Sequence, residues 1–198
     1  MKKPHLSETL RKSIHLGSLV IPLSYRYVIG FDNRRLAFSL LLLAFTISLI
    51  VEFYRFWQRD FRRTFHRVFG TILRRHEMKD FTGATYMLFS SLLCVAFFSP
   101  PIASGAIALL SVGDTFAALV GMNFGKRRFG KLGKSLEGSL ACFVSGLVFG
   151  ILWLQNPILA LTGALAATIA ELINIPVDDN LRIPLISGMA MTLMQIII

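Results

Sequence analysis

A carboxylate lies inside an apolar stretch of this chain, and a loop rich in glycine and lysine follows it. Asp114 interrupts the apolar run 101–121, and a charge within such a run is costly enough to indicate a functional site by default. In the loop, 122–136, glycines let backbone N–H groups approach phosphate oxygens, and lysines supply compensating charge. Together they predict chemistry on a nucleotide phosphate at a membrane surface. The alternative for Asp114 is a buried carboxylate with a purely structural Lys or Arg partner.

More carboxylates lie at the ends of the later apolar runs. Glu137 directly follows the loop, and Glu171 lies near the end of the run 157–175. Asp178 and Asp179 occupy the short connection to the last run. Adjacent carboxylates suit Mg²⁺, which usually accompanies a nucleoside triphosphate. A solvated turn is the alternative for this pair, but Glu171 near the same membrane boundary favours the metal site.

The N-terminal segment carries four ionisable residues at helical spacing. They are Glu8, Arg11, Lys12 and His15, and this spacing places them on one helical face. A basic anchor at the membrane surface would explain Arg11 and Lys12. It would not explain His15, which lies just inside an apolar run, so we expect the group to assist at the phosphate site.

The composition is that of a membrane protein. The mean hydropathy is +0.62 and 54% of residues are hydrophobic, yet the formal net charge is +10. Apolar spans joined by basic loops have this combination, which would be odd in a soluble domain. We expect one catalytic domain over residues 1–198. Cys94 and Cys142 lie in apolar runs and are predicted to be packing residues rather than a disulfide or metal site.

The apolar runs predict an all-α, polytopic fold with about seven transmembrane helices. They lie near 14–30, 36–54, 83–99, 101–121, 137–155, 157–175 and 183–198. Most of the 21 Lys and Arg residues fall in the N-terminal segment and in alternate loops. The positive-inside rule therefore places the N-terminus and these loops in the cytoplasm, in an inner or plasma membrane or its equivalent. The nucleotide site would face the cytoplasm.

Two further patterns concern the membrane. Between Phe53 and Arg75, apolar residues recur at every fourth position among arginines, so the basic segment 55–81 is predicted to form an amphipathic helix that binds anionic lipid headgroups or extends the second span. Because the basic residues are spread over loops, a nucleic-acid partner is not expected. Small residues also recur every four positions in 113–125 and 138–150, which predicts close packing of these two helices and could serve a homodimer.

With these motifs assembled, the chain resembles the CTP-dependent lipid-alcohol kinases, which include dolichol kinase, phytol kinase and CTP-dependent diacylglycerol kinase. The resemblance rests on Gly113-Asp114-Thr115 with Phe124-Gly125-Lys126, on Lys134-Ser135-Leu136-Glu137-Gly138, on Arg11-Lys12 with His15, and on Asp179-Asn180-Leu181 with Ile183-Pro184. It implies a helical membrane enzyme that uses CTP and Mg²⁺ to phosphorylate the hydroxyl of a diacylglycerol or of a polyprenol or dolichol-type lipid.

The resemblance also implies roles for individual residues. Asp114, Asp179 and Glu137 would be catalytic. Metal ligands would come from Asp114, Asp178, Asp179 and Glu171. The nucleotide would be bound by Gly125, Lys126, Lys134, Ser135 and Asn180, with help from Arg11, Lys12 and His15.

Two other functions stay open at this point. The related phosphatidate cytidylyltransferases share part of the pattern and would make a CDP-lipid and pyrophosphate. A non-catalytic membrane protein whose loop binds anionic lipid is the third interpretation. It leaves the convergence of Asp114, Glu137 and the Asp178–Asp179 pair on one membrane face without a reason.

Overall fold

The structure, a computed structural model, describes residues 4–129, 134–173 and 175–198, and it is almost entirely helical. The long helices are α1 (Pro4–Gly17), α3 (Arg34–Trp57), α4 (Arg59–Phe69), α5 (Gly83–Phe97), α6 (Pro100–Phe124), α7 (Leu136–Leu154), α8 (Pro157–Leu172) and α9 (Asp179–Ile197). Short elements complete the chain: α2 (Val20–Leu23), the π-helix Ser24–Ile29, the 3₁₀ turn Phe31–Asn33, and the paired strands β1 (Arg128–Phe129) and β2 (Lys134–Ser135). The predicted all-α membrane fold is confirmed.

The turns between the later helices follow from their residues. Pro100 and Pro101 begin α6, where the missing N–H of proline costs no helical hydrogen bond. Gln155 ends α7 in a left-handed conformation (φ 54°), and the Asn156 side chain then accepts hydrogen bonds from the first backbone N–H groups of α8. Asp178 caps α9 in the same way. These caps fix where α7, α8 and α9 begin and end.

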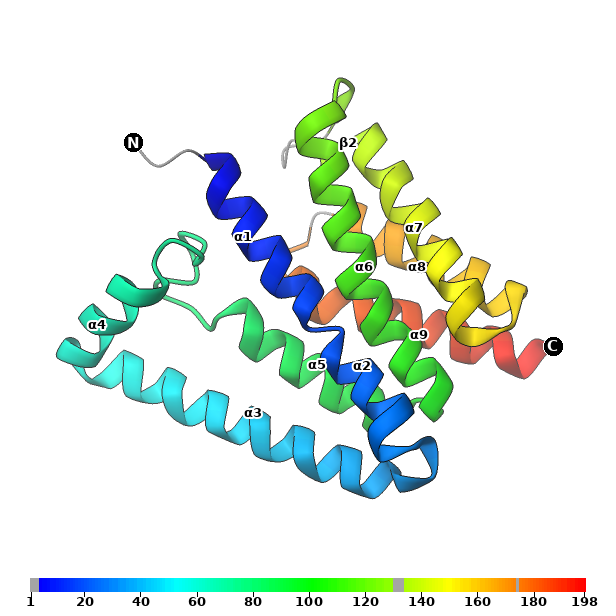
Figure 1. Cartoon of the computed structure of the whole chain (residues 1–198), viewed down its shortest axis with the longest axis horizontal. Coiled ribbons are helices and arrows are strands. Elements are labelled where there is room, and N and C mark those ends of the chain that lie inside the picture. Colours follow the sequence, from blue (N-terminus) through cyan, green and yellow to red (C-terminus); the bar gives the residue numbers. More distant parts are fainter. Residues whose placement is uncertain (1–3, 130–133, 174) are drawn as a thin grey trace.

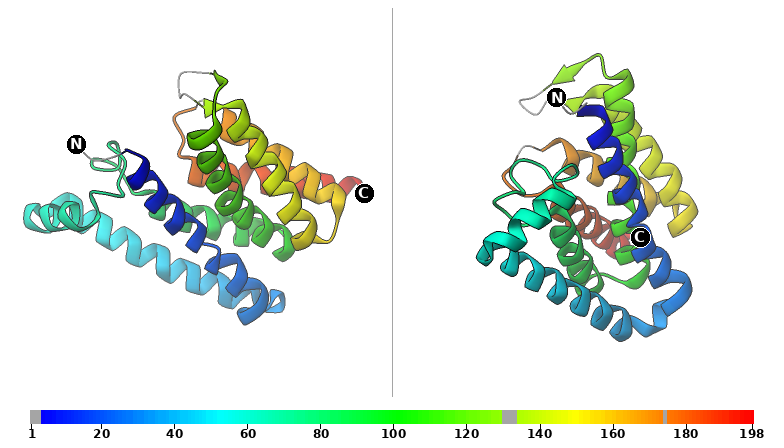
Figure 2. Two further views of the ribbon diagram at one scale, coloured as in Figure 1. Left: turned by 45° about the horizontal axis from the view of Figure 1, so that its top comes forward. Right: turned by 60° about the vertical axis from the view of Figure 1, so that its left-hand side comes forward.

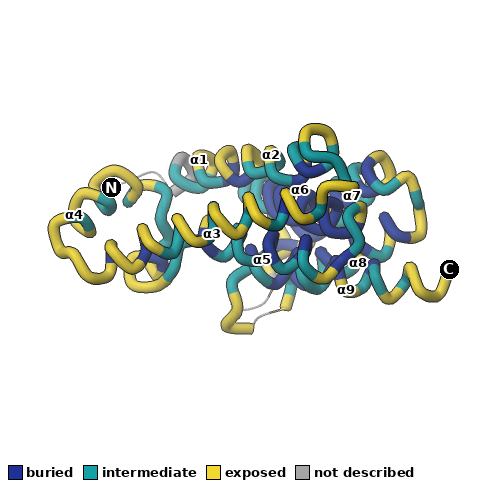
Figure 3. The backbone as a smooth tube through the Cα atoms, turned by 90° about the horizontal axis from the view of Figure 1, so that it is seen from below, coloured by how far each residue is buried: buried dark blue, intermediate teal, exposed yellow. Residues whose placement is uncertain are grey.

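Helix α6 is the centre of the molecule. Figure 3 shows its residues as the main buried group, with the largely exposed α3 running across the front. The small-residue stripes meet as predicted, because α6 and α7 form the most extensive helix contact. A Cβ on Gly138 would lie 2.8 Å from the carbonyl oxygen of Ala117 and 3.3 Å from the Cα of Gly121. Only glycine allows the backbones to approach this closely beside Asp114.

Six of the seven predicted spans correspond to helices in the structure, and their number as membrane spans stays a prediction. Helices α6, α7, α9 and the segment Phe31–Trp57 are long and apolar enough to cross a bilayer, and α5 and α8 are shorter apolar helices. The predicted first span, 14–30, is not one continuous helix. It breaks after Gly17 and continues as α2 and a π-helix. Pro22 in α2 lacks a backbone donor and disfavours a regular helix through this region.

The basic segment 55–81 also differs from the prediction. Helix α3 extends through Trp57, but the backbone leaves the helical conformation at Gln58 (φ −92°, ψ 115°) and resumes it in α4. Residues 70–82 contain only turns and bends, so the helical periodicity up to Arg75 was misleading. The reason is tertiary, since Arg55 on α3 donates hydrogen bonds to the carbonyl oxygens of Glu77 and Asp80 and holds this segment folded back.

The segments predicted to be cytoplasmic gather at one end of the molecule. Figure 1 shows the start of α1, the segment 70–82 and the end of α6 at the top and left, and the C-terminus with the α7–α8 turn at the right. The left view of Figure 2 shows the same separation. The side of the membrane that this end faces stays a prediction from the distribution of charge.

Candidate active site

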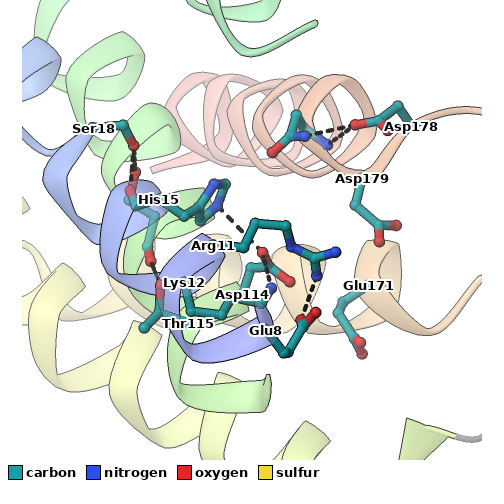
Figure 4. A network of polar contacts seen from close by, with 12 residues as sticks. Glu8, Arg11, Lys12, His15, Ser18, Asp114, Thr115, Glu171, Asp178 and Asp179 are labelled. Atoms are coloured by element: carbon teal, nitrogen blue, oxygen red, sulfur yellow. Dashed lines mark hydrogen bonds and ion pairs between the residues drawn. The ribbon is translucent and has the colours of Figure 1, made fainter. Parts of the chain in front are cut away.

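The buried carboxylate in α6 lies against the basic face of α1. The Lys12 ammonium pairs with the Asp114 carboxylate, and the Nε2 atom of His15 lies 3.3 Å from the same carboxylate oxygen without the alignment of a hydrogen bond (Figure 4). Lys12 is 3% exposed and Asp114 9%. The Thr115 hydroxyl donates a hydrogen bond to the Ser111 carbonyl oxygen within α6. The Ser111 hydroxyl shares a hydrogen bond with the Ser18 hydroxyl and so joins α6 to the segment after α1. The predicted association of the N-terminal motif with the Asp114 site is therefore present in the structure.

An apolar cavity of about 550 Å³ borders Asp114 on one side. It lies between α1, α4, α5 and the segment 70–82. Its walls include the apolar side chains of Ile14, Ile21, Phe65, Phe69, Met87 and Leu88. Its polar lining residues include Lys12, His15 and Asp114. A mostly apolar pocket with a few convergent polar groups is the usual form of a small-molecule site, and its chemistry here suits an acyl or prenyl chain.

A polar cavity of about 320 Å³ borders Asp114 on the other side. It lies between α1, α6, the start of α7 and the end of α8. Cationic residues line it, namely Arg11, Lys12, Arg74, Arg128 and Lys134. Gly121 and Gly138 contribute a floor without side chains. Four carboxylates also line it, namely Glu8, Asp114, Glu171 and Asp179, and three of them pair with Arg11, Lys12 and Lys134. A polyphosphate with its Mg²⁺ suits such a mixture of cations and carboxylates around a small-residue floor.

The two cavities share four residues: Arg11, Lys12, Arg74 and Asp114. The carboxylate thus lies where an apolar ligand and an anionic ligand would meet. Lys12 and Arg74 can offset negative charge there, and Asp114 can accept a proton. This geometry suits transfer of a phosphate group from a water-borne donor to a lipid hydroxyl.

Arg74 was not singled out from the sequence. It lines both cavities and also a third cavity of about 340 Å³ beside the α8–α9 connection. Its guanidinium lies 3.6 Å from the Asp178 carboxylate. Burial lowers the pKa of Arg74, but the carboxylates of Asp178 and Asp114 outweigh burial and raise it above its usual value. Among the many arginines of 55–81, helical spacing gave no signal that separated this one.

A buried network holds Arg74 in place. The Glu77 carboxylate accepts hydrogen bonds from the backbone N–H groups of Arg74 (2.8 Å) and Gly83 (3.1 Å). Arg55 donates to the Glu77 carbonyl (2.7 Å) and pairs with Glu52. Glu52 and Arg55 lie three residues apart in an apolar helix, and this spacing of opposite charges within a span is the signal that could have revealed them.

The loop residues predicted to bind nucleotide divide into two groups. Lys134 and Ser135 line the polar cavity, and Lys134 pairs with Glu171 at 2.9 Å. Lys126 is exposed and Gly125 packs against Ser135; neither lines a cavity described above. Residues 130–133 of the predicted loop, which include Lys131, lie outside the described residues.

Glu137 has a different environment from the one the predicted catalytic role requires. Its carboxylate accepts hydrogen bonds from the backbone N–H groups of Lys126 (3.2 Å) and Arg127 (3.3 Å), and it lines none of the three cavities. In this position it joins the start of α7 to the loop after α6. Its catalytic role stays a prediction, and the geometry favours ordering of the loop.

The remaining carboxylates are each paired with a cation. Asp179 pairs with Arg182 and lines the polar cavity with Glu171. Asp178 lines the third cavity, where its carboxylate accepts from the backbone and side chain of Asn180 (2.9 and 2.8 Å). Within residues 4–129, 134–173 and 175–198, no three His, Cys, Asp or Glu side chains form a group that could hold a metal ion. The predicted metal site is therefore not preformed by protein ligands alone.

Comparison with known proteins identifies the family. The chain is 28% identical over 93% of its length to CTP-dependent diacylglycerol kinase 1 of Saccharomyces cerevisiae, covering 72% of that protein. It is 30% identical to CTP-dependent diacylglycerol kinase 1 of Schizosaccharomyces pombe, over 73% of each chain. A probable chloroplastic phytol kinase of Triticum aestivum is 35% identical over 52% of this chain and 41% of its own.

No protein-family model matches the chain, and no solved structure matches it. The identity with the diacylglycerol kinases nevertheless extends over most of both chains, and one carboxylate, Asp114, lines both the apolar and the polar cavity. This chain belongs to the family of CTP-dependent lipid kinases, enzymes that transfer phosphate to an alcohol group.

Proposed function

We propose that this enzyme phosphorylates the hydroxyl of diacylglycerol with the γ-phosphate of CTP, at the cytoplasmic side of the membrane in which it is embedded. The observation that supports this most directly is the position of Asp114 at the junction of the apolar and polar cavities. Diacylglycerol is preferred over a prenol because the relatives matched over most of their length carry that name.

The reaction follows from the position of the side chains. The acyl chains would occupy the apolar cavity, with the glycerol hydroxyl beside Asp114. The hydroxyl oxygen attacks the γ-phosphorus, the bond from that phosphorus to the β-phosphate oxygen breaks, and the hydroxyl proton passes to the Asp114 carboxylate. Lys12 and Arg74 offset the charge that develops on the phosphoryl oxygens. The products are a lipid phosphate and CDP.

Asp114 is paired with Lys12, and this pairing fits a base that must stay ionised until the substrate arrives. When triphosphate enters the polar cavity, the Lys12 ammonium can shift toward the phosphate oxygens. The carboxylate is then free to accept the proton. His15, which lies on the apolar side, can orient the hydroxyl.

Mg²⁺ would accompany CTP, and the residues of the polar cavity fit it in part. One oxygen of Glu171, Oε2, is buried without a hydrogen-bond partner among the described residues, and Asp114 and Asp179 line the same cavity. Mg²⁺ usually takes one or two carboxylates together with substrate phosphates and waters, so a preformed cage is not required. Asp179 and Glu171 would hold the ion. Bound there, it would neutralise charge on the β- and γ-phosphates.

The decisive experiment measures label transfer from γ-³²P-CTP with Mg²⁺ to a panel of lipids by the purified enzyme. The panel contains diacylglycerol, phytol, a polyprenol and phosphatidic acid. We expect a labelled lipid phosphate from diacylglycerol and none from the Asp114→Asn variant. The control is Asp32→Asn, in the 3₁₀ turn before α3, which lines none of the three cavities and should keep full activity. Preferential labelling of phytol or the polyprenol would show that this lipid, and not diacylglycerol, is the phosphate acceptor. Release of pyrophosphate in the presence of phosphatidic acid, without a labelled lipid, would show that the enzyme is a cytidylyltransferase and not a kinase.

A further inference from the structure

The third cavity adjoins the polar cavity and has a different chemistry. It lies between the segment 70–82, the start of α5 and the α8–α9 connection. Arg74 and Asp179 line both cavities, so a ligand that occupied both would pass these two side chains. In the view of Figure 4, Asp179 lies between Asp178 in the third cavity and Glu171 in the polar cavity.

The walls of the third cavity suit a flat, uncharged ring. Ile175, Pro176 and Val177 form an apolar wall, and Tyr86 adds an aromatic ring. Nucleobases are held by stacking against such side chains, because every base has a π-face. Among the described residues, none that lines the polar cavity is aromatic, and its apolar lining is small apart from Met122.

The polar groups of the third cavity include one donor that lacks a partner. The Arg182 side chain is 3% exposed, and its Nε atom has no hydrogen-bond partner among the described residues. Its terminal nitrogens are engaged by Asp179 and by the Ile175 carbonyl (3.3 Å). A buried donor without a partner is costly, so it indicates an acceptor supplied by a ligand.

Cytosine supplies the complementary groups. Its Watson–Crick edge carries acceptors at N3 and O2 and a donor amine at position 4. The Arg182 Nε donor can bond to an acceptor of the ring, and the carboxylate of Asp80, which also lines the cavity, can accept from the amine. Uracil has a carbonyl in place of the amine and would face that carboxylate with an acceptor, which is unfavourable.

We propose that the third cavity is the nucleoside subsite of this enzyme, with cytosine against Val177 and Tyr86 and the triphosphate in the polar cavity beyond Arg74. This inference rests on the proposed use of CTP and extends it by naming where the base is bound. It divides the nucleotide between two neighbouring cavities, so that changes in one should leave recognition of the other part intact.

The first test fills the third cavity by Val177→Trp. We expect the KM for CTP to rise about tenfold or more, the scale on which base stacking contributes. The inhibition constant of tripolyphosphate, which lacks a nucleoside, and the KM for diacylglycerol should stay within about twofold of the wild type. The matched control is Val148→Trp on α7, an exposed valine that lines none of the three cavities. Equal changes for CTP and tripolyphosphate, or no change for either, would overturn the proposal.

The second test uses the unmodified enzyme and so does not depend on a variant that folds. Photolysis with 5-azido-CTP, competed by excess CTP, should label peptides from 74–86 or 175–182. Label confined to 117–139 would place the base in the polar cavity and contradict the inference. Failure of the proposed function itself gives a separate result, since the wild-type enzyme would then transfer no phosphate from CTP to a lipid, wherever the photolabel is found.

Discussion

This molecule contains two buried pairs of a basic and an acidic side chain, and the two pairs differ in their surroundings. The pair Lys12–Asp114 joins α1 to α6 and lies between two cavities. The pair Glu52–Arg55 lies within α3, and neither residue lines any of the three cavities. Both consist of a basic and an acidic residue whose side chains are buried. Their unused hydrogen-bonding capacity separates them.

Arg55 has its donors engaged. It donates to the Glu52 carboxylate and to the carbonyl oxygens of Glu77 and Asp80, and its side chain is fully buried. At the Asp114 pair, by contrast, the Nε2 atom of His15 lacks a hydrogen bond and open space adjoins the carboxylate. A satisfied buried pair fixes a conformation, whereas an incompletely satisfied pair beside a cavity leaves interactions for a ligand.

The largest expected effect is that of Asp114→Asn on catalysis. Removal of a general base typically lowers rates by about 10² to 10⁴-fold, so kcat should fall on that scale. Stability should fall by less than for a buried charge left without a partner, since the amide oxygen introduced by Asp114→Asn can still accept a hydrogen bond from the Lys12 ammonium. Steady-state kinetics and SDS-induced unfolding in mixed micelles measure the two quantities. A large loss of stability with kcat retained in the folded fraction would make this pair structural, like Glu52–Arg55.

The converse is expected for Arg55→Met. Removal of the guanidinium leaves the Glu52 carboxylate buried and unpaired, which costs about 3–5 kcal/mol in comparable cases. The unfolding transition should move to much lower SDS concentration, and protease cleavage should increase in the segment 70–82. Arg62→Met on α4, which removes an exposed arginine, is the control. Unchanged stability in Arg55→Met would remove the contrast between the two pairs.

A smaller effect is expected at Arg74, which lines the cavities beside Asp114 and is held in place by Glu77, a partner of Arg55. A hydrogen bond to a charged group contributes about 1.5–3 kcal/mol, so Arg74→Gln should raise the KM for CTP about 10- to 100-fold. Arg74→Lys should restore part of this because it keeps the charge but not the planar donor geometry. Arg75→Gln, next in sequence and exposed, should have no effect. If Arg75→Gln raises the KM for CTP as much as Arg74→Gln does, Arg74 acts by general attraction of anions and not by contact with CTP in the cavities.

The sequence predicted the chemistry of the Asp114 pair and missed its counterpart. A carboxylate in an apolar run before a glycine- and lysine-rich loop is a local pattern, and the small-residue stripes correctly predicted how α6 packs on α7. Arg74 depends on tertiary structure. Its segment has helical periodicity, but the hydrogen bonds from Arg55 to distant carbonyls override that preference. The three cavities likewise could not be predicted, because each is lined by side chains from several helices and no local sequence pattern indicates them.

The smallest effect is expected for Glu137. At this residue the role implied by the family resemblance and the role indicated by the structure differ most. The family resemblance predicts a catalytic carboxylate, whereas the observed side chain accepts two backbone hydrogen bonds from the loop after α6. A neutral amide keeps an acceptor but loses the charge that strengthens these bonds, at a cost of about 0.5–1 kcal/mol. Glu137→Gln should therefore raise the KM for CTP about two- to fivefold and leave kcat nearly unchanged. A loss of kcat comparable to that of Asp114→Asn would mean that the loop rearranges when nucleotide binds and brings this carboxylate to the reacting phosphate.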